Sequence, residues 1–142
     1  MGIPYSDIYA LFLQQVTDQS LGNMLPADMN YHMSRWLMSA STKFALDCRQ
    51  DILSRDSSSQ AFTVVLTDLE QQILAQLMVV EWLSPALYTA QLLRQVISDK
   101  DFKVHSQANH IEQLTKLRNY AQDEAESLIM RYSYMSGLGN LR

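Results

Sequence analysis

The chain has 142 residues, of which 47% are hydrophobic and 18% are charged, and its formal net charge is −4. This composition is typical of one globular domain and excludes a chain that is disordered throughout. The acidic balance argues against nonspecific binding to duplex DNA, which needs clustered lysine and arginine. Only four glycines and three prolines occur, and this scarcity favours long helices over a many-turned β architecture. We therefore expect an all-α, single-domain bundle of about five helices.

The single cysteine, Cys48, cannot form an internal disulfide, which fits a reducing compartment. No charged-then-apolar leader opens the chain, and no apolar run is long enough to cross a bilayer. These features predict a soluble protein made in the cytoplasm, without a membrane segment.

Two helices are predicted in the N-terminal third. Ser6 is the expected cap of the first, and its inward-facing residues are Ile8, Leu11, Phe12 and Val16. Residues 17–26 contain Gly22 and Asn23 and are predicted to form a loop. Pro26 suits the first turn of a second helix that ends near Cys48. The apolar stripe of this second helix is Met29, Met33, Trp36, Leu37, Ala40 and Phe44.

A polar stretch, residues 49–66, separates the second predicted helix from the third. Two short β-prone segments, residues 51–53 and 62–66, flank an exposed, flexible region between them. The pattern predicts either a small β-hairpin or a long loop. The candidate contact residues at its tip are Arg55, Asp56, Ser57, Ser58 and Ser59.

Residues 67–88 are predicted to form the helix around which the others pack. Thr67 and Glu70 have the spacing of a capping box, in which each side chain accepts a hydrogen bond from the other residue's backbone N–H. The following residues are apolar nearly all round the helix, which predicts burial on several sides. These residues are Leu69, Ile73, Leu74, Leu77, Met78, Val79, Val80, Trp82 and Leu83. At Pro85, either Ser84 caps a fresh fourth helix or the same helix continues with a kink.

The last predicted helix begins at Ser106, after a charged connector at residues 99–104. Its inward-facing residues are Ile111, Leu114, Leu117, Ala121, Ala125, Leu128 and Tyr132. Gly137 and Gly139 disfavour further helix, so residues 136–142 are predicted to be an extended tail beyond a bundle of residues 1–135. The tail is too apolar for a free end, and it either folds back on its own core or docks on a partner. The candidate partner-binding residues are Tyr134, Met135, Leu138, Leu141 and Arg142, with Phe102 and Lys103 in the connector.

No pattern in the sequence predicts catalysis, a metal or a cofactor. His105 and His110 are five residues apart, which misaligns them as ligands on one helix face. Cys48 has no neighbouring base and is expected to be a small buried side chain. No glycine-rich phosphate loop occurs. The remaining acidic and histidine candidates are typical of solvated positions: His32, Asp51, Asp56, Asp99 and Asp101.

Four stretches carry a family resemblance: YSDIYALFLQQVTD at residues 5–18, LTDLEQQILAQLMVVEWLSP at 66–85, SDKDFKVHSQANH at 98–110 and YSY at 132–134. They span nearly the whole chain, and none is a catalytic signature. In type and order they resemble the small head-to-tail connector proteins, also called neck or adaptor proteins, of tailed bacteriophages.

The resemblance implies a helical bundle that assembles as a ring, usually of twelve copies, beneath the portal of a filled capsid. The ring would belong to the neck of the virion and be assembled in the cytoplasm of the host bacterium. Its role would be to extend the DNA channel and to provide the docking platform for the stopper or tail-completion protein. Family members grip the portal through an extended C-terminal segment, which here corresponds to residues 136–142 and is shorter than some.

Such a ring would not bind DNA in a sequence-specific way. Twelve copies at −4 each carry −48, and this charge repels DNA phosphates at separations near the Debye length of about 8 Å. DNA could therefore slide through the channel rather than adhere to it.

Two other classes of function remain open. One is a soluble helical interaction module or regulator with no virion role, which would bind a partner helix in a methionine-rich groove. The relevant methionines are Met24, Met29, Met33 and Met38, although methionine at helical spacing also fills cores. The other is an enzyme with a site inside the bundle. Particle mass and imaging separate the connector from the module, because only the connector forms rings with a central hole.

Overall fold

The structure, a computed structural model, describes the backbone of residues 2–15, 26–97 and 101–140 and the side chains of residues 2–15, 29–84 and 112–135. The elements in this part of the chain are α1 (Tyr5–Gln15), α3 (Pro26–Phe44), β1 (Arg55–Asp56), β2 (Ala61–Phe62), α4 (Asp68–Ile97) and α5 (Asp101–Asn140). The predicted mostly helical class is confirmed, and a small β-hairpin separates α3 from α4. The predicted loop at residues 17–25 lies outside the described residues.

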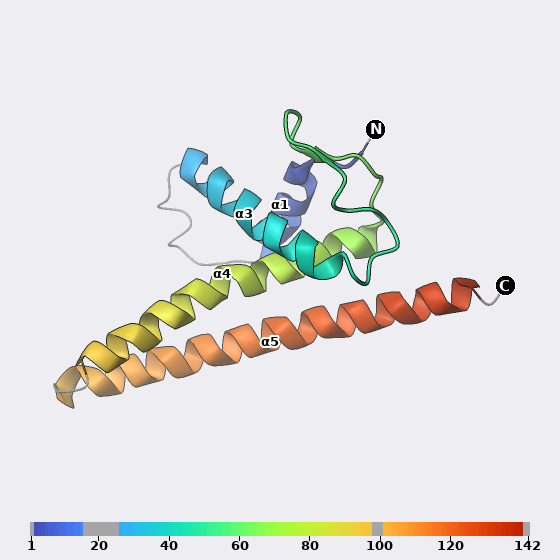
Figure 1. The fold of residues 1–142 in the computed structure, drawn as a ribbon. Helices are drawn as coiled ribbons and strands as arrows, with labels where there is room; N and C mark the ends of the chain where they lie inside the picture. The colour runs from blue at the N-terminus through green and yellow to red at the C-terminus, as the bar shows by residue number, and fades with distance from the viewer. Residues whose placement is uncertain (1, 16–25, 98–100, 141–142) are drawn as a thin grey trace.

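A long antiparallel pair of helices, α4 and α5, forms the axis of the molecule (Figure 1). At 1.5 Å per residue, α4 is about 45 Å long and α5 about 60 Å. Helices α1 and α3 pack on the first half of α4, on the side away from α5. The core therefore lies near the N-terminal half of α4, and the remainder of the pair extends away from it.

The start of α4 confirms the predicted capping box. The Glu70 N–H donates to Thr67 Oγ1 at 3.2 Å, and the Thr67 N–H donates to Glu70 Oε1 at 2.8 Å. Two backbone donors at the helix end are satisfied in this way, and carboxylates at positions 68 and 70 face the positive end of the helix dipole.

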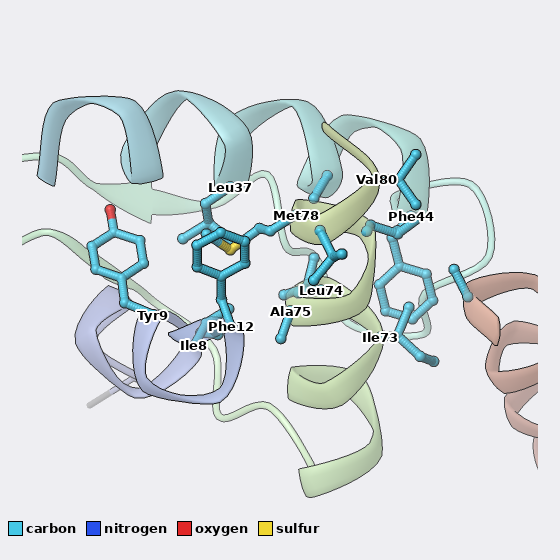
Figure 2. Packing of buried hydrophobic residues seen from close by; sticks show 14 of the residues in the cluster. Ile8, Tyr9, Phe12, Leu37, Phe44, Ile73, Leu74, Ala75, Met78 and Val80 are labelled. Carbon is cyan, nitrogen blue, oxygen red and sulfur yellow. The ribbon is translucent and has the colours of Figure 1, made fainter. Parts of the chain in front are cut away.

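Eight consecutive residues of α4, Ile73 to Val80, are buried. They are enclosed because α1, α3 and α5 all contact this helix, and Figure 2 shows side chains of α1 and α3 meeting α4 in one cluster. The methionines belong to this core: Met33 is buried, and Met29 and Met38 pack against it. These methionines thus contribute to core packing; Met24 lies outside the described residues.

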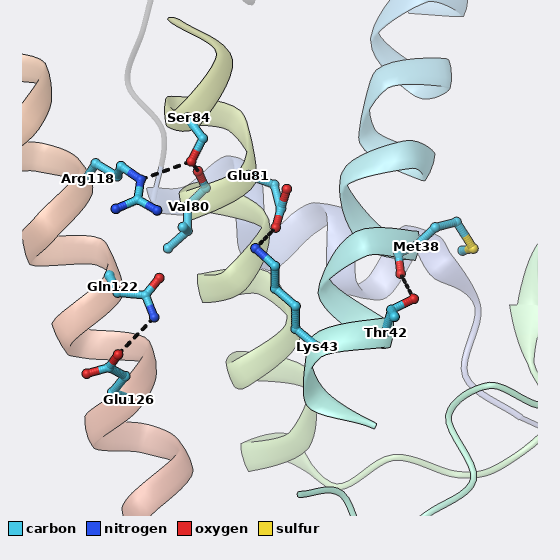
Figure 3. A network of polar contacts seen from close by, with 9 residues as sticks. All are labelled: Met38, Thr42, Lys43, Val80, Glu81, Ser84, Arg118, Gln122 and Glu126. Carbon is cyan, nitrogen blue, oxygen red and sulfur yellow. Dashed lines mark hydrogen bonds and ion pairs between the residues drawn. The ribbon is translucent and has the colours of Figure 1, made fainter. Parts of the chain in front are cut away.

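Helix α4 continues through Pro85 to Ile97, so the fourth helix predicted to begin at Ser84 is not a separate one. The Ser84 hydroxyl does not cap a new helix. It donates to the Val80 carbonyl at 2.8 Å and accepts a hydrogen bond from Arg118 Nε at 3.1 Å (Figure 3). Proline removes a single backbone donor, and the contact with α5 supports the helix at this point. The five-helix count is accordingly not confirmed.

Helix α5 is longer at both ends than the sequence predicts. It begins at Asp101, inside the predicted connector, and it continues through Asn140, so residues 136–140 are helical rather than extended. Each glycine costs about 1 kcal/mol in a helix interior, but elongating an existing helix adds one hydrogen bond per residue. Two glycines near the end of a 40-residue helix do not stop it. Residues 99–100 and 141–142 lie outside the described part of the chain.

The hairpin strands are displaced from the predicted β-prone segments. Arg55 pairs with Phe62 and Asp56 with Ala61, so the first strand lies in residues that the sequence predicts as loop. The chain's N-terminus explains the shift, because the Phe62 N–H donates to the Ile3 carbonyl at 2.9 Å. A Cβ on Gly2 would lie 1.6 Å from the Phe62 carbonyl oxygen, so this close approach requires glycine. Tertiary pairing, rather than β propensity, sets the register.

Candidate partner-binding surface

The last described turns of α5 expose large apolar side chains. Met130 is 72% exposed, Tyr134 68% and Met135 57%. Met130 and Tyr134 are four residues apart and therefore lie on one side of the helix. Exposed apolar side chains that cluster on one face are typical of a contact surface. Met135 is exposed at the flank of the same turn, and we call Met130, Tyr134 and Met135 together the outer surface of α5.

The opposite side of the same turns is fixed to the rest of the molecule by Tyr132. Its hydroxyl donates to Glu70 Oε2 at 2.7 Å and accepts a hydrogen bond from the Arg49 N–H at 2.8 Å. Its ring packs edge-on against Phe44, with the centroids 5.4 Å apart. One tyrosine thus joins the C-terminal part of α5 to the end of α3, the following loop and the start of α4.

Glu70 is the acceptor at the centre of this attachment, and it is only 2% exposed. Its Oε1 accepts the capping hydrogen bond from Thr67, and its Oε2 accepts from Tyr132 and, at 3.5 Å, from the Cys48 thiol. Burying a carboxylate is costly unless its oxygens are hydrogen-bonded. Here both oxygens have donors, so the cluster is a satisfied structural one.

Burial shifts the acidity of both donors. Desolvation raises the pKa of the Tyr132 phenol well above its ordinary value and raises the pKa of the Cys48 thiol to about 11. Both groups are therefore protonated at neutral pH, as donors to Glu70 must be. A thiol that remains protonated is a poor nucleophile, so this arrangement supports attachment of α5 rather than covalent chemistry at Cys48.

A groove of about 670 Å³ lies between α1, α4 and α5. Its wall combines apolar side chains, including Trp82, Leu117 and Tyr120, with several glutamines and Glu124. Leu117, which the sequence places among the inward-facing residues, is 55% exposed here. Gln76 is a buried residue of the groove lining, and its side-chain amide donates to the Ala121 carbonyl at 3.1 Å.

The predicted partner-binding residues do not form one surface. Tyr134 and Met135 lie exposed near the C-terminal end of α5, whereas Phe102 and Lys103 lie in its first turn. Thirty-two residues separate Phe102 from Tyr134, which corresponds to about 48 Å along a helix. Figure 1 shows these two ends of α5 far apart. Leu138 is part of the helical backbone, and Leu141 and Arg142 lie outside the described residues.

The candidate contact residues 55–59, which would face the tail in a connector, lie at the tip of the hairpin. Residues 56–60 are exposed, while Arg55 is half-buried with its guanidinium against the Met38 sulfur. The Asp56 carboxylate accepts hydrogen bonds from the Ser58 N–H at 3.0 Å and the Ser58 hydroxyl at 2.6 Å. Hydrogen bonds from Ser58 and Ser59 lower the pKa of Asp56. In Figure 1 the tip points away from α5, so this loop and the outer surface face different neighbours.

Sequence reasoning missed Met130 and the pairing of Tyr132 with Glu70. A signal for Met130 exists, because it lies one turn before Tyr134 on the side of α5 away from Ala121 and Ala125. No sequence signal exists for the pairing, since Tyr132 and Glu70 are 62 residues apart.

Across residues whose side chains are described, no cluster of three or more potential metal-ligating side chains occurs. No described helix is both long and apolar enough to cross a membrane. Comparison with protein-family models, curated proteins and solved structures finds no match to this chain.

Proposed function

We propose that this chain is a structural subunit of the head-to-tail connector of a tailed bacteriophage. In this role, copies of the chain form a ring beneath the portal, extend the DNA channel and provide a platform for the stopper or tail. The resemblance of residues 5–18, 66–85, 98–110 and 132–134 to connector proteins motivates the proposal. The role is mechanical and involves no catalysis, no metal and no cofactor.

One observation supports this function more than any other. The same turns of α5 are attached to the core through Tyr132 and expose Met130 and Tyr134 on the other side, with Met135 exposed at the flank. A contact surface on a rigid, anchored helix loses little conformational freedom when a partner binds, so less of the contact energy is spent on ordering it. We propose that the portal is gripped by this helical end of α5 rather than by an extended tail.

The size of the contact fits a repeated assembly. A fully buried apolar side chain contributes about 1.5–3 kcal/mol relative to its exposed state, so two or three such side chains give a weak contact for one subunit. A ring repeats that contact, and linked contacts raise the overall affinity by about 10²–10⁴ without any new interaction. Weak single contacts also allow misplaced subunits to dissociate before the ring closes.

The test compares two matched double variants in co-sedimentation with the portal ring of the same phage. Met130→Ser/Tyr134→Ser removes two exposed side chains from the outer surface. Leu46→Ser/Val65→Ser removes two others, 92% and 61% exposed, from the segments that follow α3 and precede α4. We expect the first variant to lose portal binding and the second to retain it, with unchanged helical circular dichroism in both.

Negative-stain images of the wild-type protein with the portal should show an added ring with a central hole. Equal portal binding by both double variants would overturn the role of the outer surface. A wild-type protein that neither binds the portal nor adds a ring would overturn the connector function itself.

A helical interaction module is the second candidate, and the groove between α1, α4 and α5 favours it. The groove has a volume of about 670 Å³. The apolar part of its wall suits the apolar face of a partner helix. Under this alternative, substitution of Trp82 or Leu117 would weaken partner binding, and no rings would form.

A further inference from the structure

Two faces of the molecule carry exposed charges of opposite sign that have no ion-pair partner among the described side chains. One is on α3 and the other is on the middle of α5. Helix α4 lies between these helices, with α3 on one side and α5 on the other (Figures 1 and 3). The two faces therefore cannot meet within one copy of the chain.

The face on α3 is basic and aromatic. Tyr31 is 57% exposed, and the Arg35 guanidinium lies 5.9 Å from the centre of its ring. Asp28, in the first turn, is the acidic residue of α3, and from Met29 to Phe44 the sequence contains no aspartate or glutamate. The ion pairs found among the described side chains are Lys43 with Glu81 and Lys116 with Glu112, so Arg35 is not neutralised by either.

The face on α5 is acidic and aromatic. Tyr120 is 70% exposed, and Asp123 and Glu126 are exposed in the following turns. Between residues 119 and 130 the sequence contains no lysine or arginine. Glu126 accepts a hydrogen bond from the Gln122 amide at 3.0 Å (Figure 3), which leaves its charge uncompensated.

We propose that the α3 face of one copy docks on the α5 face of a second copy, in a contact that pairs Arg35 with Asp123 and Glu126. This inference rests on the proposed ring function and names the surfaces that join neighbouring subunits. It differs from the outer surface at Met130 and Tyr134, which contacts the portal. The occupant is a second copy because one chain carries both complementary faces.

The geometry of the two faces supports a helix-to-helix contact. On α3 the tyrosine and the charge are four residues apart, and on α5 Tyr120 and Asp123 are three residues apart. Each face thus presents an aromatic ring and a charge within one helical turn. Packed helices lie about 8–10 Å apart, which allows both groups on one helix to reach those on the other.

The arrangement also determines the type of assembly. Because different surfaces meet, the contact is heterologous, and repetition of a heterologous contact gives a closed ring or an open filament. A contact between two α5 helices, in contrast, would give a two-fold dimer. The placement of the faces on opposite sides of α4 therefore favours a ring over a dimer.

The experiment uses charge reversal and sedimentation velocity on the full chain, with wild-type protein up to about 1 mM, the concentration range of weak association. Arg35→Glu makes both faces acidic, and Asp123→Lys/Glu126→Lys makes both faces basic. We expect each variant alone to self-associate about tenfold more weakly than wild type, because like charges then face each other. An equimolar mixture of the two should recover wild-type association, since each acidic face meets a basic one.

A control variant, Asp51→Lys, makes a charge change of the same kind on an exposed loop and should associate like wild type. Circular dichroism melting is measured for every variant, and an Arg35→Gln variant covers the case in which Arg35→Glu does not fold. Wild-type protein that stays monomeric overturns the inference. Association that Arg35→Glu leaves unchanged, or variants that the mixture does not rescue, overturns it as well.

The outcomes also separate this contact from the proposed function. If the portal ring binds wild-type protein and Arg35→Glu assembles normally, the connector function stands and the α3–α5 contact is overturned. If self-association depends on these charges but the protein does not bind the portal, the α3–α5 contact stands and the connector function is overturned.

Discussion

Helices α4 and α5 pack against each other, yet they differ in how far their neighbours enclose them. In α4, every residue from Ile73 to Val80 is buried. In the described part of α5, residues 112–135, the buried side chains are Ala121, Ala125 and Tyr132. The difference shows that neighbours enclose residues 73–80 of α4 on all sides, whereas residues 112–135 of α5 have one packed side and a broad exposed side.

The small residues on α5 explain how one side can suffice. Ala121 and Ala125 let the helix approach α4 closely, and the Gln76 amide donates to the Ala121 carbonyl at this contact. Tyr132 then adds a polar attachment near the C-terminal end. The contact is therefore close but narrow, and much of the α5 surface remains for binding.

The largest expected effect comes from the enclosed helix. Leu74→Ala removes a side chain that is 0% exposed, and such changes in cores cost about 2–5 kcal/mol through lost burial and a residual cavity. The matched change Leu117→Ala, at a residue of α5 that is 55% exposed, should cost about 0.5 kcal/mol. Urea unfolding of both variants measures the contrast. Equal losses of unfolding free energy in the two variants would mean that α5 is as enclosed as α4 at these positions.

The sequence was sufficient to predict the enclosed helix, because its signals are local. The capping box at Thr67 and Glu70 and the continuous apolar run after it depend only on nearby residues, and both are confirmed. Pro85 is also a local signal, but it leaves a fresh helix and a continued helix open, and the structure shows the continued one. The Arg118 hydrogen bond to Ser84 comes from the neighbouring α5, and the local pattern does not reveal it.

The candidate site was only partly predictable. Residue type alone indicates Tyr134 and Met135 as contact residues, and both are exposed. Phe102 and Tyr134 are 32 residues apart within the single helix α5, and a tail expected to be extended gives no reason to expect that separation. The attachment through Tyr132 depends on the fold that brings residues 49, 70 and 132 together.

A smaller effect is expected from the attachment of α5. Tyr132→Phe keeps the ring against Phe44 but leaves the Arg49 N–H without its acceptor and removes one donor to Glu70. The Arg49 N–H is partly buried, so the loss of its acceptor should cost about 1 kcal/mol, the lower end of the range for buried polar groups. In Tyr132→Phe, amide hydrogen exchange should accelerate near residues 125–135 more than it does in α4. Uniform acceleration in both helices would mean that Tyr132 supports the whole fold rather than the end of α5.

The smallest expected effect is a pH dependence of stability that arises where α5 is attached to the core. The pKa of the Cys48 thiol is raised from 9.0 to about 11 in the folded protein, chiefly by burial. A raised pKa favours the protonated form, so the stabilisation is fully present below pH 9 and is lost as the pH rises from about 9 to 11. The raised pKa of Tyr132 acts in the same direction. We expect the melting temperature to fall over this range and to fall less in Cys48→Ala, because alanine has no proton to lose. Identical pH profiles for the variant and the wild type would show that the thiol is not coupled to the attachment of α5.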